Sequence, residues 1–322
     1  MTKVKPLPWF NRPRRQDFLI CPANRDADMD AIPTQFTCAD GVTLKGHWFR
    51  PPGKSGPPVI VNAATGVKAA YYHRYAAFLA RHGFPALTYD YRGIGLSRPA
   101  RLQGCGFTWR QWGEEDMEAA LRHVLESEGE NPMVVGHSIG GFLPGYAVSS
   151  ARISRLLTVG AQYAYWPDYR KRDRLPFFLK WHVAMPALTL ALGYFPGRRL
   201  GWLEDLPAGV ALEWSFRGPR MEARLKEPLR SEILSRFAAV RAPTLALSVS
   251  DDPFATESAV TRALDYYRSA DRRKVMLQPA DLGADKVGHF DLFHSRHAER
   301  FWTGTLLWLR DGINPWPDRV FA

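Results

Sequence analysis

The sequence has few cysteines, no long uninterrupted apolar run and no metal-ligand spacing, and each absence excludes a class of protein. Its three cysteines, Cys21, Cys38 and Cys105, are odd in number and far apart, which argues against a disulfide framework and favours a reducing compartment. No run of about 18 uncharged apolar residues is present, because charged residues such as Lys180 interrupt the longest apolar zone, residues 175–195. No cluster of His, Cys, Asp and Glu has the spacing of a metal site, so neither a metal nor a cofactor is expected.

The amino-terminal segment lacks the features of a targeting sequence. Residues 1–15 are basic and contain prolines, but the apolar segment of about 7–15 residues that a secretory signal needs does not follow them. Together with the cysteine content, this predicts a cytoplasmic protein.

The charge of the chain is unbalanced, with 43 Lys and Arg against 32 Asp and Glu, a net charge of +11 at pH 7. Such an excess can attract nucleic acid, anionic lipid or an anionic substrate. The basic residues are dispersed and no nucleic-acid-binding motif accompanies them, so a nucleic-acid partner is not expected. The basic cluster of Arg170, Lys171, Arg172 and Arg174 flanks an aromatic segment, and it would suit an anionic membrane surface or an anionic substrate.

Short apolar strands alternate with helical segments over most of the chain. Alternation of this kind predicts an α/β fold, a mostly parallel sheet covered by helices on both faces. The expected strands are 35–38, 42–49, 58–62, 85–90, 132–136, 153–159, 243–249 and 273–278, and the expected helices are 71–82, 108–126, 140–150, 256–268 and 292–310.

Residues 161–235 interrupt this alternation. They are rich in tryptophan, proline and glycine and have no clear strand. An inserted cap or lid over the active site is the simplest interpretation, and a helical excursion that thickens the core is the alternative. The expected organisation is an amino-terminal arm at 1–33, a core at 34–160 and 236–322, and a cap at 161–235.

The apolar residues of the expected cap allow two interpretations. They could line a tunnel for an apolar acyl group, or they could be the packing face of an ordinary helix. The residues are Leu175, Phe177, Phe178, Leu179, Trp181, Met185, Leu188 and Leu190.

The strongest chemical signal is the G-x-S-x-G motif Gly136-His137-Ser138-Ile139-Gly140. It follows a short apolar run and precedes a segment expected to be helical, which is the context of a nucleophile elbow. In this strand-to-helix turn the glycines keep side chains away where the chain is crowded, and the serine hydroxyl projects into a pocket. Ser138 is therefore the candidate nucleophile; the alternative is a glycine-rich turn that only closes a strand.

A serine nucleophile needs a base within hydrogen-bond reach and a third group that orients the base. With a nucleophile elbow, the acid and then the histidine follow the serine in chain order, each after a late strand. Asp252 comes directly after the strand expected at 243–249 and is preferred to its neighbour Asp251 as the acid. His289 lies in a loop before the last helix and is the candidate base.

The other histidines are weaker candidates for the base. His137 adjoins the nucleophile, but neighbouring residues on an elbow point apart. His294 and His297 fall in the last helical segment and are expected to face solvent.

Acyl transfer also needs hydrogen-bond donors for the tetrahedral oxyanion. One donor is expected from the backbone amide of Ile139, the residue after the nucleophile, and the other from the loop after the strand at 58–62. Ala64 is the preferred second donor and Thr65 is the reserve.

These motifs resemble those of the α/β-hydrolase superfamily. Residues 89–97 also look like the superfamily's D-x-R-G-x-G-x-S loop, and the resemblance covers the two core segments, with the insertion where the superfamily carries its cap. Residues 193–199 and 204–207 look like a bacterial subgroup akin to the serine aminopeptidase and monoacylglycerol-lipase branch. One departure is that Asn62-Ala63 stands where the usual oxyanion loop has His-Gly.

Residues and resemblance together predict a serine hydrolase that cleaves a carboxylic ester or related small acyl substrate through an acyl-enzyme. An acyltransferase that uses the same three side chains is one alternative. A hydrolase fold retained as a non-catalytic binding protein is the other.

Overall fold

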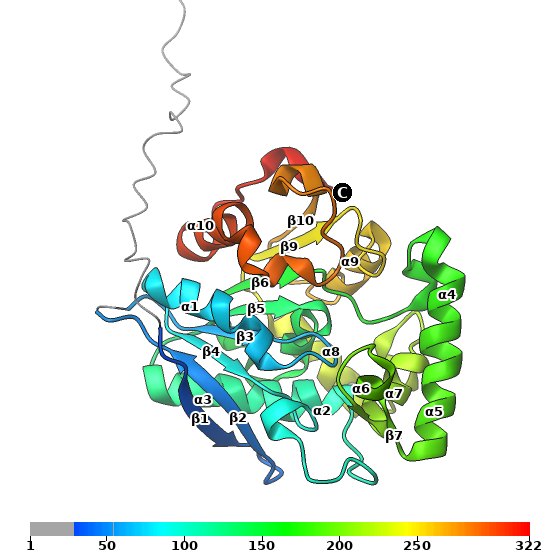
Figure 1. Ribbon diagram of the computed structural model, residues 1–322. Helices are drawn as coiled ribbons and strands as arrows, with labels where there is room; N and C mark the ends of the chain where they lie inside the picture. Colours follow the sequence, from blue (N-terminus) through cyan, green and yellow to red (C-terminus); the bar gives the residue numbers. More distant parts are fainter. Residues whose placement is uncertain (1–28, 54) are drawn as a thin grey trace, which may run out of the picture.

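The computed structural model describes residues 29–53 and 55–322 of the chain. The expected arm at 1–33 lies largely outside the described residues, and the first strand begins at Ile32. One large sheet and a layer of helices on each of its faces make up most of the molecule (Figure 1).

The central sheet has nine strands in the order β1-β2-β4-β3-β5-β6-β9-β10-β11. The strands from β4 to β10 in this order run parallel, whereas β1, β2 and β11 are antiparallel to their neighbours. The mostly parallel sheet is thus as predicted. The strands are β1 (Ile32–Thr37), β2 (Thr43–Phe49), β3 (Val59–Asn62), β4 (Ala86–Tyr89), β5 (Met133–His137), β6 (Arg155–Val159), β9 (Thr244–Val249), β10 (Arg272–Leu277) and β11 (Val320–Phe321).

The central strands are buried along their whole length because helices cover both faces, which explains their continuous apolar sequences. Helices α1 and α10 lie on one face and α3 and α8 on the other (Figure 1). The helices of the core are α1 (His73–Arg81), α2 (Trp109–Gln111), α3 (Glu118–Glu128), α8 (Leu229–Ala239), α9 (Glu257–Leu264) and α10 (Thr303–Asp311). Of these, α8 crosses the expected boundary between the cap, which ends at residue 235, and the core.

The segment after the G-x-S-x-G motif differs from the expected helix at 140–150. It forms three short 3₁₀ turns, Ser138–Gly141, Leu143–Tyr146 and Val148–Arg152. Pro144 lacks the amide hydrogen that a continuous α-helix would use there, and the glycines nearby have low helix propensity. The turn after Ser138 is therefore a 3₁₀ turn and not the start of a long helix.

The inserted segment is mainly helical and lies along one side of the core (Figure 1). It contains a pair of two-residue strands, which the sequence analysis did not predict. Its elements are α4 (Arg174–Phe178), α5 (Met185–Leu192), β7 (Tyr194–Phe195), α6 (Gly197–Leu200), β8 (Leu206–Pro207) and α7 (Ala208–Ser215).

One helical run, Lys171–Leu192, contains α4, a π-helical turn at Leu179–Ala184 and α5. By length and composition this run is apolar enough to cross a membrane, which the sequence analysis did not expect. Its inner face packs against the rest of the protein, where Trp181, Met185 and Thr189 are buried. Only 28% of its most apolar stretch is buried inside the protein, so most of the run is at least partly exposed.

Candidate active site

Ser138 lies at the end of β5, in the middle of the sheet, in a strained backbone conformation. Its φ is +55°, which a residue with a side chain rarely adopts. A side chain at Gly136 would place its Cβ 2.3 Å from the carbonyl oxygen of Gly140, and one at Gly140 would lie 2.6 Å from that of Asn62. The crowding attributed to the two glycines is present, and the turn has the geometry of a nucleophile elbow.

Asp252 and His289 come together from the loops that follow β9 and β10. His289 Nδ1 lies 2.7 Å from Asp252 Oδ2, and both side chains are buried. Asp252 Oδ1 accepts hydrogen bonds from the backbone amides of Phe254 (2.8 Å) and Ala255 (3.1 Å). Burial alone would raise the pKa of Asp252, but His289 and these donors outweigh it and hold the pKa below its ordinary value.

The rival carboxylate, Asp251, is engaged elsewhere. Its oxygens accept the backbone amides of Val287 (2.8 Å) and Gly288 (2.9 Å), so it fixes the loop that carries His289. The structure thus gives the two neighbouring aspartates different contacts: Asp252 contacts the imidazole and Asp251 holds its loop.

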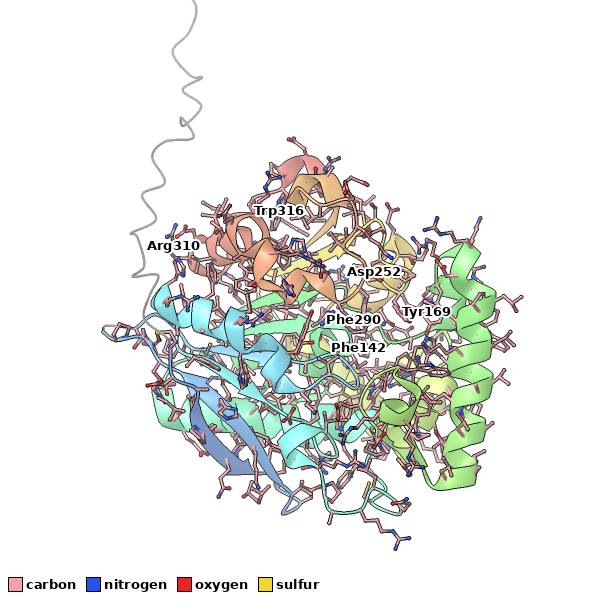
Figure 2. All side chains as sticks on the ribbon, viewed as in Figure 1. Phe142, Tyr169, Asp252, Phe290, Arg310 and Trp316 are labelled. Carbon is pink, nitrogen blue, oxygen red and sulfur yellow. The ribbon has the colours of Figure 1, made fainter. Side chains whose placement is uncertain are left out.

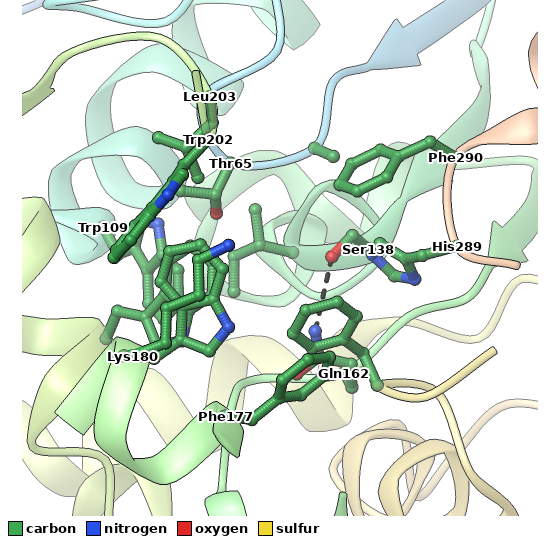
Figure 3. A pocket seen from close by; sticks show the side chains of 15 residues that line it. Thr65, Trp109, Ser138, Gln162, Phe177, Lys180, Trp202, Leu203, His289 and Phe290 are labelled. Atoms are coloured by element: carbon green, nitrogen blue, oxygen red, sulfur yellow. Dashed lines mark hydrogen bonds between the residues drawn. The ribbon is translucent and has the colours of Figure 1, made fainter. Parts of the chain in front are cut away.

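Ser138 and His289 line the same cavity, but they are not hydrogen-bonded to each other. Among the described residues, the one hydrogen-bond partner of Ser138 Oγ is the side-chain amide of Gln162, whose Nε2 lies 3.4 Å away (Figure 3). Gln162 is buried just beyond β6, and its Oε1 accepts the backbone amide of Ala164. The sequence analysis missed Gln162, although its place at the carboxyl end of a central strand was a signal.

A buried hydrogen-bond chain connects the loop after β3 to the loop of His289. His137 Nε2 lies 2.9 Å from the carbonyl oxygen of His289, so Nε2 carries the proton and Nδ1 is an acceptor. The Tyr72 hydroxyl therefore donates to His137 Nδ1 (2.7 Å), and it accepts the amide of Ala64 (2.9 Å). His137 uses both nitrogens and positions the loop of His289, and burial lowers its pKa to about 3.

The amide of Ala64, the preferred second oxyanion donor, donates to the Tyr72 hydroxyl in this structure. The backbone amide of Thr65, the reserve candidate, donates to none of the residues that the structure describes. Thr65 and Ile139 line the cavity together with Ser138. Thr65 is therefore the better candidate for the second donor.

The cavity beside Ser138 has a volume of about 170 Å³ and is mainly aromatic (Figure 3). The inserted segment supplies Phe177, Trp181, Trp202 and Trp214, and the core supplies further rings, among them Phe290. A segment that contributes much of the wall of the cavity is placed as a lid would be.

The helical run Lys171–Leu192 is called the cap helix. Only part of it fits the interpretation that its apolar residues line a tunnel. Phe177 and Trp181 line the cavity, whereas Leu175, Leu179 and Leu190 are 67%, 52% and 72% exposed. Within the inserted segment, Tyr169 packs edge-on against Phe177 and its hydroxyl accepts from the Trp214 indole at 3.3 Å. The Tyr169 ring also packs edge-on against Phe254 of the core, with centroids 5.5 Å apart, and this contact joins the inserted segment to the core (Figure 2).

Two other residues singled out in the sequence have structural contacts. His297 does not face solvent as expected: it is buried and its Nε2 lies 2.6 Å from Asp291 Oδ2. Asp90, in the D-x-R-G-x-G-x-S loop, accepts the backbone amides of Ala69 (2.7 Å) and Leu96 (2.8 Å), so it holds this loop beside α1. In residues 29–53 and 55–322 no group of three or more His, Cys, Asp or Glu could hold a metal ion.

Comparison with known proteins extends the resemblance that the motifs suggest. The model of the alpha/beta hydrolase family matches residues 59–302, more than half of the chain. The chain belongs to the alpha/beta hydrolase family. No curated protein matches its sequence.

Solved structures show the same fold at low sequence identity. The alpha/beta hydrolase GrgF from Penicillium sp. sh18 is 18% identical, with a TM-score of 0.56, over 88% of this chain and all of that one. An esterase from Thermogutta terrifontis, solved with malate bound, is 15% identical with a TM-score of 0.54, over 87% of this chain and 98% of that one. The esterase Pf2001 from Pyrococcus furiosus is 14% identical with a TM-score of 0.53, over 87% and 91%.

Proposed function

We propose that this family member is a serine hydrolase that cleaves a carboxylic ester or a related acyl compound through an acyl-enzyme. The observation that carries the proposal is that Ser138, on a strained elbow, and His289, paired with Asp252 at 2.7 Å, open on one cavity. The three residues follow β5, β9 and β10, whose carboxyl ends meet at one edge of the sheet.

The proposed reaction has two steps with a common base. Asp252 accepts a hydrogen bond from Nδ1–H of His289 and stays ionised, which leaves Nε2 free to take the proton of the Ser138 hydroxyl as its oxygen attacks the acyl carbon. The alcohol leaves with the proton from Nε2, and the acyl group stays on Ser138. Water then gives a proton to Nε2 and attacks the acyl carbon. The bond between that carbon and Ser138 Oγ breaks, Oγ takes the proton back from Nε2, and the acid is released.

The oxyanion of each tetrahedral intermediate would accept hydrogen bonds from the amides of Ile139 and Thr65. Gln162 Nε2, at 3.4 Å from Ser138 Oγ, is close enough to hold the hydroxyl before the attack and to support the oxyanion after it. These donors lie in a cavity with aromatic walls, where hydrogen bonds to a developing charge are stronger than in water.

The direct test is the hydrolysis of p-nitrophenyl butyrate by the wild type and by Ser138→Ala. We expect the wild type to release p-nitrophenol and the variant to be inactive with an unchanged melting temperature. Undiminished activity in the folded variant would rule out Ser138 as the nucleophile.

Acyl transfer to an alcohol is the second candidate, because the aromatic walls limit the access of water to the acyl-enzyme. Product analysis with added butanol distinguishes the two. Butyl ester as the main product at low alcohol concentration would favour transfer, and free acid would favour hydrolysis.

We also propose that the outer face of the cap helix contacts an anionic membrane surface. Leu175, Leu179 and Leu190 are exposed on this helix, and Lys171 and Arg172 are exposed at its start. Sedimentation with neutral vesicles and with vesicles that contain phosphatidylglycerol tests this contact: we expect binding to the anionic vesicles that salt weakens, and no binding to either would refute it.

The placement in the serine aminopeptidase and monoacylglycerol-lipase branch stays a proposal. Residues 193–199 and 204–207 carry this resemblance. The support for the proposal is that these two segments adjoin each other, since β7 and β8 pair at Phe195 and Leu206.

A further inference from the structure

One cationic side chain, Lys180, lies among the aromatic walls of the cavity (Figure 3). Its Nζ is 4.4 Å from the centre of the Trp181 ring and 4.2 Å from that of Trp202. The two rings meet edge to face, with centroids 5.5 Å apart at 80°, so together they form a corner around the ammonium group.

The shape of the cap helix directs Lys180 toward the cavity. Phe177, Lys180 and Trp181 have the spacing i, i+3, i+4 and all line the cavity, whereas Leu179 and Val183 between and beyond them are exposed. Lys180 lies in the π-helical turn Leu179–Ala184, a local widening of the helix that often occurs at functional sites. The lysine is therefore part of the inner face, and it is not one of the solvated charges at the start of the helix.

Within residues 29–53 and 55–322, the ammonium group has no anionic partner. No aspartate or glutamate lines the cavity, and no described carboxylate forms an ion pair with Lys180. Partial burial lowers its pKa, which means that the charged form has lost some of its hydration. By contrast, Arg170 at the start of the same helix pairs with Asp173. The faces of two indole rings compensate the charge of the lysine only in part.

A cation held in a cavity with aromatic walls and without a counter-ion is suited to bind an anion, because the surroundings strengthen the attraction. Ser138 lines the same cavity, so a ligand that spans it can meet both residues. The volume of about 170 Å³ is close to the roughly 150 Å³ of an apolar cavity that holds benzene. The space therefore suits a short apolar spacer between a reacting carbonyl and a charged end.

We infer that the cavity selects esters that carry a carboxylate at the end of a short apolar chain, with the carboxylate bound by Lys180 in the corner of Trp181 and Trp202. This inference rests on the proposed hydrolase function and gives that function a substrate class. In it, Lys180 is a specificity-determining residue that contacts the charged end of the substrate, while the ester carbonyl lies at Ser138.

The first experiment compares substrates of equal chain length that differ in one charge. The wild type is assayed with mono-p-nitrophenyl adipate and with p-nitrophenyl hexanoate, next to Lys180→Met, Lys180→Arg and the control Lys226→Met, an exposed lysine elsewhere in the inserted segment. We expect the wild type to prefer the adipate ester at least tenfold in kcat/KM. Lys180→Met should lose about 10–100-fold on adipate alone, which is the size of one charged hydrogen bond. Lys180→Arg should retain most of the preference and Lys226→Met all of it.

The second experiment needs no catalysis. The four indole rings that line the cavity make tryptophan fluorescence a reporter of binding in Ser138→Ala. We expect monomethyl adipate to bind at least tenfold more tightly than dimethyl adipate, and the difference to vanish when Lys180→Met is added.

The two experiments separate the inference from the proposed function. Hydrolysis of both esters without a preference, or a preference that survives Lys180→Met, would overturn the carboxylate site and leave the hydrolase standing. Lysine-dependent binding of the monoester without hydrolysis of any ester would support the site and overturn the hydrolase. The absence of both binding and hydrolysis would overturn both.

Discussion

The two neighbouring aspartates after β9 provide a matched pair of substitutions whose expected losses of activity differ greatly in size. In Asp252→Asn, the oxygen of the new amide must take the place of Oδ1, because that position accepts the amides of Phe254 and Ala255. The NH₂ group then lies where Oδ2 lay, 2.7 Å from His289 Nδ1. Two donors cannot face each other, so His289 changes to the tautomer with its proton on Nε2 and can no longer accept a proton from Ser138.

The expected loss of kcat in Asp252→Asn is on the order of 10⁴, the magnitude typical of a base held in the wrong tautomer. In Asp251→Asn, the amide keeps one of the two hydrogen bonds to Val287 and Gly288 and loses the other. We expect this to cost about 1–3 kcal/mol of loop stability and to lower kcat/KM by no more than about tenfold.

The assay is the hydrolysis of p-nitrophenyl butyrate at pH 7.5, with circular dichroism and the melting temperature as controls for folding. A folded Asp252→Asn within tenfold of the wild type would refute the assignment of the acid. An Asp251→Asn that is more damaging than Asp252→Asn would show that the two roles are exchanged.

Three further predictions concern residues around the site. Because burial lowers the pKa of His137 from 6.5 to about 3, the unfolded chain binds more protons below pH 6.5, and stability falls as the pH falls. Urea unfolding should show that His137 accounts for about 2 kcal/mol of the unfolding free energy lost between pH 7 and pH 5. The variant His137→Gln should lose about that much less over the same pH range, and an identical loss in the variant would contradict this. Arg92→Met should destabilise the fold by about 3–5 kcal/mol in urea, because it leaves Asp116, fully buried and 2.5 Å from Arg92, without its partner; a loss under 1 kcal/mol would refute the argument. Gln162→Leu should lower kcat about 10–100-fold with little change in KM, and an unchanged kcat would remove Gln162 from the reaction.

The sequence predicts those parts of the site whose geometry depends on residues close together in the chain or on the ends of parallel strands. Gly136, Ser138 and Gly140 form one turn, so their spacing along the chain is enough to predict an elbow. Asp252 and His289 each follow a strand of a parallel sheet, and the sheet brings the ends of such strands to one edge. Most strands and helices were expected from apolar runs and their alternation along the chain, whereas the order of the strands in the sheet was not predicted.

Contacts between distant segments could not be predicted in this way. The amide of Ala64 is engaged because the Tyr72 hydroxyl, from the next helical segment, lies within hydrogen-bond distance of it. The sequence of the loop that contains Ala64 does not indicate this contact. The burial of His297 depends likewise on Asp291, which pairs with it across a turn. The cap helix carries apolar residues on its exposed face as well as on its buried face, so its periodicity did not show which leucines are exposed or that Lys180 faces the cavity.

The central claim is that Ser138 is a nucleophile activated by its surroundings, and covalent labelling by a fluorophosphonate followed by peptide mass spectrometry tests it most directly. The wild type should carry one phosphonyl adduct on the Ser138 hydroxyl. Ser138→Ala should remain unlabelled, and His289→Ala should react far more slowly. An unlabelled, folded wild type, or an adduct on a different residue, would contradict the account.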